Sequence, residues 1–440
     1  MTSSSGQTID EQIKHVWNQI DPERLKELIV ELIEIPSPTG QERALAEWAV
    51  KKMSGMGLGA TLQVIDEEQA NAIGRITGDS TGVSLLLYAP IDTLTTGNPE
   101  EDVPWIGPEL REDMKTHAVV DGNFVLGLGA SNPKGHAACI IAAAEVIVAS
   151  GVELRGDLIV GLGAGGMPTN KRANPTMSRY NAGQGNGCSF MIEQGVFPDF
   201  ALIAKPGWAV AWEEVGLCWF EVQVGGTFNY VGSRHRMPYV NPIVESTKVI
   251  VGLEEWFKAY SSAHTDGLVA PQGNIGAIRS GWMHMPSVCG ATCSFMVDLR
   301  TSPRSTPSEV RREFAQGIND IRSANPELDI TWEMVLSIPG TSTNPSNWIV
   351  ESAVRAWEKL EGRGHEPILL NSGATDANIL RGRGIPTARI GMDRIGEDAP
   401  LTLDFAAGMN VVDVREMVRL TKHLVHTALD TCNLRRDVLD

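Results

Sequence analysis

The chain has 440 residues, of which 42% are hydrophobic and 21% charged, and its formal net charge is −17 at pH 7. This length predicts two domains or one large domain with an insertion, and the composition is that of a globular protein with a substantial core. So acidic a surface repels nucleic acid and anionic lipid, and we therefore expect neither as a partner.

Nothing in the chain resembles a targeting or membrane segment. No apolar run reaches transmembrane length, and the polar stretch 1–7 lacks the pattern of a signal peptide. The cysteines are scattered through apolar segments, which predicts buried free thiols in a reducing compartment. We therefore expect a cytoplasmic protein.

The first half of the chain alternates between predicted strands and helices. Helical spacing of apolar residues predicts helices over 11–35, 41–53 and 136–150. The run Val83–Tyr88 is continuously apolar, as is typical of a strand covered on both faces. Together with strands predicted at 60–65, 72–76, 158–162 and 200–204, the alternation predicts an α/β domain with a mixed, mostly parallel sheet flanked by helices.

The pattern changes near residue 214. The following elements have the order β-α-β-β-α-β, which is a ferredoxin-like α+β arrangement. They are predicted at 215–225, 242–260, 274–280, 289–300, 307–322 and 328–335. Beyond Pro339 the α/β pattern resumes, with elements at 346–361, 366–370, 376–382, 386–390 and 412–430. We predict a discontinuous α/β domain over 1–213 and 337–440, with a second domain inserted at 214–336.

Polar or glycine-rich segments follow five predicted strands of the α/β domain. Ligands of open α/β sheets bind outside the carboxyl ends of the strands, so these segments locate a candidate site. They are 90–92, 131–135, 163–166, 205–206 and 372–376. The stretch 167–187 is long for an ordered loop, which is typical of a functional or mobile segment.

Six short motifs carry a resemblance to a known family. In chain order they read IPSPTGQE (35–42), LYAPIDT (87–93), GLGASNPKG (127–135), GSRH (232–235), VDLR (297–300) and GATDA (373–377). Their order and spacing resemble the metallopeptidase family that includes aminoacylase, acetylornithine deacetylase, succinyl-diaminopimelate desuccinylase and glutamate carboxypeptidase. The resemblance implies a zinc-exopeptidase-like fold with an inserted lid or dimerisation domain, and a homodimer formed through that domain.

The zinc-ligand positions of this family are substituted in the chain. Members bind two zinc ions through imidazoles and carboxylates, with a neighbouring Glu as general base. The corresponding positions here are Pro90, Asn132, Gly163–Gly166, Lys205 and the region of 405–407. We therefore expect the zinc pair to be absent, with no metal ligands and no cofactor.

Lys205 is the most informative of these substitutions. A buried lysine can replace the charge of a metal, polarise a carbonyl, or act as a base with a lowered pKa. It can equally pair with Asp92 or Asp376 in an inactive site. Asn132 keeps the shape of the bridging Asp and can donate to a substrate oxygen, while Asp92 either orients Lys205 or Asn132 or merely ends a strand.

Further candidates follow from the motifs. Ser131 and Lys134 form the Ser-x-x-Lys pattern of some acyl-transfer enzymes, although both residue types also fit the ordinary family motif. The resemblance implies that His235 stabilises an oxyanion and that Asn241 and Arg300 hold a substrate carboxylate. The remaining candidate substrate contacts are Lys134, Ser372, Thr375 and Asp376.

Three interpretations stay open. The first is a hydrolase of an amide or ureido C–N bond in a small carboxylate-bearing substrate, working without the family's dinuclear zinc site. The second is a non-catalytic relative that binds a small carboxylate or serves as a complex subunit. The third is an amidohydrolase with a rearranged single-metal site. The clustering of Ser131, Asn132, Lys134 and Lys205 favours an enzyme.

Overall fold

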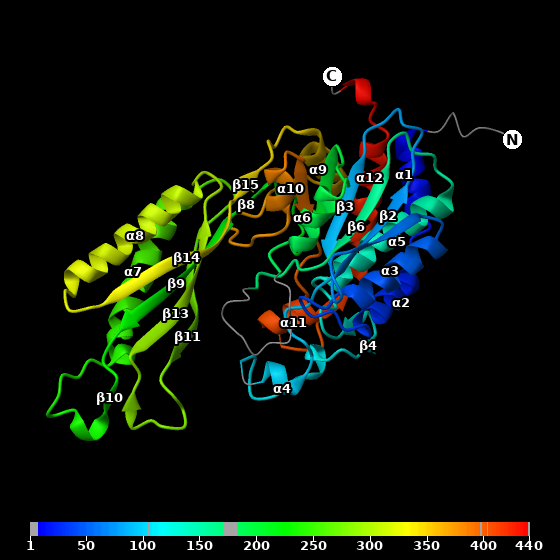
Figure 1. The fold of residues 1–440 in the computed structure, drawn as a ribbon. Coiled ribbons are helices and arrows are strands. Elements are labelled where there is room, and N and C mark those ends of the chain that lie inside the picture. The colour runs from blue at the N-terminus through cyan, green and yellow to red at the C-terminus, as the bar shows by residue number, and fades with distance from the viewer. Residues whose placement is uncertain (1–7, 104, 170–182, 397, 403, 439–440) are drawn as a thin grey trace. The chain divides into compact units, whose positions relative to one another are not determined.

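The computed structural model describes residues 8–103, 105–169, 183–396, 398–402 and 404–438 (Figure 1). The predicted loop 167–187 therefore falls largely outside the described residues. The chain divides into two compact units. The first comprises 1–212, 343–367 and 375–440, and the second comprises 213–342 and 368–374.

A six-stranded sheet forms the centre of the first unit, in the order β1-β2-β6-β3-β7-β16. The pairs β6–β3, β3–β7 and β7–β16 are parallel, whereas β1–β2 and β2–β6 are antiparallel. The strands are β1 (Gly59–Val64), β2 (Ala70–Ile76), β3 (Leu85–Pro90), β6 (Leu158–Gly163), β7 (Phe200–Ala204) and β16 (Thr387–Ile390). Every residue of the four parallel strands is buried, which confirms the predicted mostly parallel sheet.

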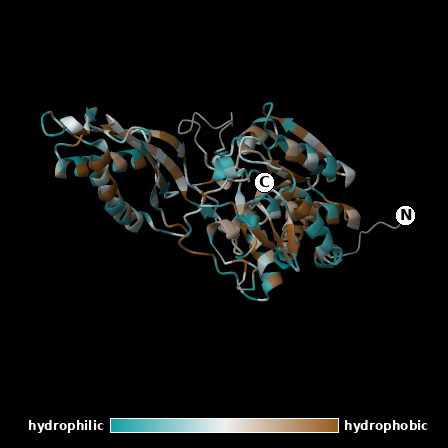
Figure 2. Ribbon diagram, turned by 90° about the horizontal axis from the view of Figure 1, so that it is seen from below, coloured by the Kyte–Doolittle hydropathy of each residue, from teal (hydrophilic) through white to brown (hydrophobic). Residues whose placement is uncertain are grey.

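Helices cover both faces of this sheet. On one face α5 (Lys134–Ser150) and α12 (Val414–Cys432) contact β3, while α2 (Pro22–Ile33) and α9 (Trp348–Glu361) pack against those two helices. On the other face α6 (Asn186–Glu193) and α10 (Ala377–Gly382) pack over a second apolar cluster. Hydrophobic residues accordingly concentrate along the central strands in Figure 2. None of the helices within the described ranges is long and apolar enough to cross a membrane.

The smaller elements of this unit are α1 (Ile9–Trp17), α3 (Arg43–Gly55), α4 (Pro99–Asp102) and α11 (Phe405–Asn410). A three-stranded sheet joins β4 (Val119–Asp121), β5 (Phe124–Leu126) and β17 (Val411–Asp413). The single helix predicted over 11–35 is wrong, because α1 ends at Trp17 and α2 begins at Pro22. Asp21 caps the second helix through the Glu23 N–H, and a proline is favoured at the first helical position.

The second unit has the predicted ferredoxin-like architecture. Its four-stranded antiparallel sheet has the order β11-β13-β9-β14, and α7 (Pro242–His264) and α8 (Pro307–Ala324) share one core with it. The strands are β9 (Gly216–Gly225), β11 (Gly273–Ser280), β13 (Thr292–Thr301) and β14 (Ile330–Ile338). Two short ladders complete the unit, β8 (Glu213–Glu214) with β15 (Thr341–Ser342), and β10 (Asn229–Tyr230) with β12 (Val288–Cys289).

The strand predicted at 366–370 does not form. Residues 368–370 are exposed, and Leu370 has a φ of 60°, which a strand residue does not adopt. The chain instead makes an isolated parallel bridge between Asn371 and Val269, so this segment belongs to the second unit. Apolar character alone suggested a strand that the backbone conformation excludes.

Candidate active site at the carboxyl ends of the strands

Lys205 and Asn132 are in contact where the parallel strands end. Lys205 directly follows β7 and is 7% exposed, and its Nζ donates to Asn132 Oδ1 across 3.2 Å. An ammonium group can only donate, so the amide oxygen of Asn132 faces the lysine. The amide NH₂ of this partly exposed residue is therefore directed elsewhere and can donate to a ligand.

The loop that carries Asn132 is held by α11. The backbone N–H groups of Ser131 and Asn132 both donate to the carbonyl of Met409, across 2.9 and 3.0 Å. The N–H of Gly129 donates to Asn410 Oδ1 across 2.8 Å. These contacts hold the backbone at Asn132 and just before it.

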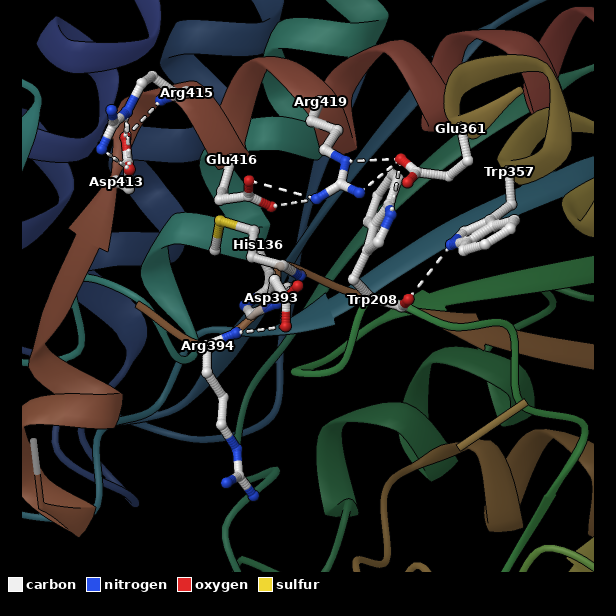
Figure 3. Close-up of polar contacts among 11 residues, drawn as sticks. His136, Trp208, Trp357, Glu361, Asp393, Arg394, Asp413, Arg415, Glu416 and Arg419 are labelled. Carbon is white, nitrogen blue, oxygen red and sulfur yellow. Dashed lines mark hydrogen bonds and ion pairs between the residues drawn. The ribbon is translucent and has the colours of Figure 1, made fainter. Parts of the chain in front are cut away.

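The segment that carries Lys205 is held three residues later by Trp208. The indole Nε1 of Trp208 donates to Glu361 Oε1 across 3.1 Å, and its carbonyl accepts from Trp357 Nε1 across 3.2 Å. The guanidinium of Arg419 lies 4.2 Å from the Trp208 ring centre and also donates to Glu361 (Figure 3). Cation–π and charge-assisted contacts of this kind restrict the Trp208 ring, three residues after Lys205.

Asp92 lies two residues beyond β3 and is fully buried. Its Oδ1 accepts from the Gly166 N–H across 2.7 Å, and its Oδ2 accepts from Thr39 Oγ1 and the Met167 N–H across 2.7 and 2.8 Å. Burial raises the pKa of Asp92, while these donors and the positive charge of Lys205 oppose the rise. Asp92 is therefore an electrostatic partner of Lys205.

Glu42, which the sequence analysis did not single out, is a second fully buried carboxylate beside Asp92. Its Oε1 accepts from the N–H groups of Gly40 and Gly165, across 2.8 and 3.0 Å, and its Oε2 accepts from Gln69 Nε2 across 2.8 Å. Burial, and then the charge of Asp92, raise the pKa of Glu42 to about 8. Glu42 and Gly165 are 123 positions apart in the chain, so the sequence carries no local signal for this contact.

His136 is buried next to the same loop. Its Nε2 faces the Met392 N–H at 3.3 Å and accepts from it, so Nδ1 carries the proton and donates to the Ser131 carbonyl across 2.8 Å. Burial, and then the charge of Lys205, lower the pKa of His136 to about 3. Figure 3 shows it among the loop residues that follow β16. His136 is therefore a neutral structural residue.

The Ser-x-x-Lys pattern does not bring its two side chains into a catalytic contact. Lys134 is fully buried, and its Nζ donates to the carbonyl of Ile35 across 2.8 Å. Burial lowers the pKa of Lys134 to about 7. Ser131 is 9% exposed, and its carbonyl serves His136. Lys134 thus bonds to the backbone, and its contact with substrate stays a prediction.

Asp376 and Thr375 lie at the start of α10 in the first unit. The phenol of Tyr88, which is fully buried, donates to Asp376 Oδ2 across 2.6 Å, and burial raises the pKa of Tyr88 well above its usual value. Thr375 Oγ1 accepts from the Ala377 N–H across 3.2 Å. A Cβ added to Gly163 would lie 2.1 Å from the Tyr88 hydroxyl, so the phenol fills the space that a side chain at 163 would need.

The remaining candidates belong to the second unit. Asn241 caps α7, because its Oδ1 accepts from the Ile243 N–H across 3.0 Å. His235 is exposed and accepts from Arg236 Nε across 2.8 Å. The roles that the resemblance implies for these two side chains stay predictions.

The other two candidates of this unit also have partners within it. Arg300 binds Asp298, two residues earlier on β13, across 2.8 Å. Ser372 Oγ donates to the carbonyl of Ala270 across 2.5 Å. Substrate binding by Arg300 and Ser372 likewise stays a prediction.

The positions that correspond by resemblance to the family's metal ligands carry side chains of different chemistry. Proline has no donor for a metal at position 90, the amide of Asn132 is neutral, and Lys205 brings a positive charge to within 3.2 Å of it. The Gly163–Gly166 segment carries no carboxylate. Over the described residues no group of three His, Cys, Asp or Glu side chains gathers that could hold a metal ion.

Comparisons with known proteins place this fold. No protein-family model matches the chain. It is 21% identical over 460 residues to N-formyl-4-amino-5-aminomethyl-2-methylpyrimidine deformylase of Bacillus subtilis (strain 168), and the alignment covers 98% of this chain and 100% of that protein. Human carnosine dipeptidase 1 matches with a TM-score of 0.70 and 14% identity, covering 96% and 99% of the two chains. The Bacillus subtilis YXEP protein, described as a dinuclear metal-binding peptidase of the M20 family, matches with a TM-score of 0.62 and 15% identity, covering 93% and 97%.

These matches confirm the resemblance to the metallopeptidase family at the level of the fold. They also correct the expectation that the protein has no cofactor, because solved structures with this fold include a dinuclear metal-binding peptidase and a metallo-carboxypeptidase. The prediction that the protein has no cofactor is therefore wrong. The neighbours are peptidases and amidohydrolases, which act on C–N bonds.

Proposed function

We propose that the protein is an amidohydrolase that cleaves an amide or ureido C–N bond in a small substrate. The contact between Lys205 and Asn132 at the strand ends, with Asp92 buried beside them, carries this proposal. Ligands of α/β sheets bind at this edge. The end-to-end match to a deformylase supports the same class of reaction.

The two side chains supply a binding site for the acyl oxygen. Lys205 offers an ammonium donor and Asn132 offers its outward amide NH₂, so a carbonyl placed between them is polarised towards attack by water. Before the reaction, Asp92 balances the charge of Lys205. As negative charge develops on the acyl oxygen, the attraction between that oxygen and the two donors, Lys205 and Asn132, becomes stronger. Preorganised donors are effective in such a site because little reorganisation is needed during reaction.

The substrate class follows from two independent arguments. By resemblance, Arg300 and Asn241 of the second unit bind a carboxylate, which favours N-acyl or N-carbamoyl amino acids. The deformylase is named for removing a formyl group from an aminomethylpyrimidine, which favours an N-formyl amine. The two classes differ in whether a carboxylate is needed.

The test is turnover by the purified chain on a matched panel of N-formyl, N-acetyl and N-carbamoyl compounds, each with and without a carboxylate. Elemental analysis of the protein accompanies it, and each assay is run as purified, after chelation and with added divalent metal. Hydrolysis of any member supports the proposal, and the preferred member identifies the substrate class. Failure on every member under all three conditions would refute it.

A non-catalytic small-carboxylate-binding protein is the second candidate. It is favoured by the lack of carboxylates at Gly163–Gly166, where the resemblance implies the general base. A panel compound that raises the melting temperature without being hydrolysed would support this candidate.

We also propose that the protein forms a homodimer through its second unit. β11 is an edge strand of the four-stranded sheet, and Ile278 on it is 57% exposed. Exposed apolar side chains on α7 add to this surface, namely Ile243, Val244 and Val251. An open strand edge beside apolar residues favours pairing with a second copy.

A further inference from the structure

A single turn after β6 holds two buried carboxylates. The consecutive N–H groups of Gly165, Gly166 and Met167 all donate to carboxylate oxygens. The first donates to Glu42 across 3.0 Å, and the next two donate to Asp92 across 2.7 and 2.8 Å. The turn therefore couples Glu42 to Asp92 through adjoining peptide groups.

The same carboxylates hold the loop before α3. Thr39 Oγ1 donates to Asp92 across 2.7 Å, and the Gly40 N–H donates to Glu42 across 2.8 Å. Asp92 thus holds both the turn and this loop, and so does Glu42. Loss of either carboxylate would remove hydrogen bonds from both the turn and the loop. It would therefore weaken the contacts that hold the other carboxylate.

The turn needs glycine for this approach. Gly165 has a φ of 62°, which most residues avoid. A Cβ on Gly166 would lie 2.3 Å from Pro90 Cβ and 3.2 Å from Asp92 Oδ1. The glycines therefore allow the N–H groups to reach the two acids.

We propose that Glu42 is a positioning residue of the site, which acts by fixing the turn that holds Asp92 next to Lys205. This inference rests on the proposed amidohydrolase function. Glu42 acts through the turn: the Gly165 N–H donates to Glu42, and the next two N–H groups donate to Asp92.

The charge state of Glu42 determines how well it holds Asp92 next to Lys205. With a pKa of about 8, Glu42 is mainly protonated at neutral pH, and its Oε1 accepts from two backbone N–H groups while its Oε2 accepts from Gln69 Nε2. Asp92 is the titratable group that faces it, with Lys205 beyond. Ionised Glu42 repels Asp92 across the turn and opposes negative charge on the acyl oxygen. Activity should therefore fall as pH rises through about 8.

Glu42→Gln is the test, because glutamine is uncharged like the protonated acid and keeps an oxygen for Gly40 and Gly165, while its NH₂ replaces the oxygen that accepts from Gln69. We expect kcat near neutral pH to stay within about threefold of wild type, the acid limb to be unchanged, and the alkaline limb to move to higher pH. Glu42→Ala should lower kcat by about tenfold or more with little change in KM. The matched control is Glu47→Gln, because Glu47 is an exposed glutamate on α3. This variant should leave kcat near neutral pH, the acid limb and the alkaline limb unchanged.

Thermal stability tests Glu42 without any substrate. A carboxyl with a raised pKa in the folded state gives its full stability below its unfolded pKa near 4.5 and loses it as pH rises through about 8. The melting temperature of wild type should therefore fall relative to Glu42→Gln between pH 5 and pH 9, whereas Glu47→Gln should follow wild type. Parallel curves for wild type and Glu42→Gln would overturn the inference even in an active enzyme. If no compound of the panel is turned over, the proposed function is refuted. The comparison of melting temperatures still tests Glu42 in that case.

Discussion

Replacing Lys205 by methionine separates the two roles that the structure gives this side chain. Methionine keeps much of the length and apolar stem but removes the donor to Asn132 and the charge beside Asp92. Loss of one preorganised donor to an oxyanion costs about 10²–10³ in kcat, equivalent to about 3–4 kcal/mol. Loss of the charge leaves a fully buried Asp92 without this cation, which costs about 3 kcal/mol of folding stability at neutral pH.

The sign of the pH dependence distinguishes this explanation from a general packing defect. Burial already raises the pKa of Asp92, and removing Lys205 removes one of the interactions that oppose the rise. A carboxyl whose folded pKa is higher loses more stability as pH rises, so the deficit of Lys205→Met should grow from acid to neutral pH.

The assays are kcat on the best panel substrate and the free energy of unfolding in urea at several pH values. Lys51→Met, at an exposed position on α3, is the matched control. Turnover by Lys205→Met within threefold of wild type would refute the assigned role, and a deficit that does not change with pH would refute the Asp92 argument.

Two further substitutions test the packing behind the site and the assembly. Gly163→Ala places a Cβ 2.1 Å from the Tyr88 hydroxyl and should lower the free energy of unfolding in urea by about 1–3 kcal/mol. The control Gly364→Ala, with no atom within 4 Å of the added Cβ, should be nearly neutral. Equal stabilities of the two variants would contradict the tight fit at Gly163. Ile278→Lys on the β11 edge should convert the proposed dimer to a monomer in sedimentation equilibrium without loss of folding, and an unchanged mass would argue against this surface.

The sequence predicted the sheet well because its strands are buried on both faces. Val83–Tyr88 and 158–162 are continuous apolar runs, and the structure makes them central parallel strands. It failed where apolar character and backbone conformation disagree, as at 368–370, where Leu370 has a positive φ. Asp21 and Pro22 are typical of a helix start, but the helical spacing of apolar residues continues across them, so a single helix was predicted.

The candidate site was only partly visible in the sequence. Strand ends located Asp92, Asn132 and Lys205, and the contact between the last two joins residues 73 positions apart. Glu42 ends the IPSPTGQE motif, but the motif alone did not indicate a role for its carboxylate in the site. Burial and distant backbone donors give it importance, and neither is readable from one sequence.

Asn132 shows how charge and hydrogen bonding together define this site. If position 132 supplies an amide donor, then Asn132→Asp, which introduces the carboxylate that the family resemblance implies at this position, should impair the enzyme. The new carboxylate would face the Lys205 ammonium at about 3 Å, neutralise it, and remove the outward NH₂. We expect kcat to fall by about 10²-fold while the folded state is retained, because the added ion pair is compact and charge-assisted. Full activity in this variant would show that the NH₂ makes no contact with the acyl oxygen, and the proposed binding of the carbonyl between Lys205 and Asn132 would then be wrong.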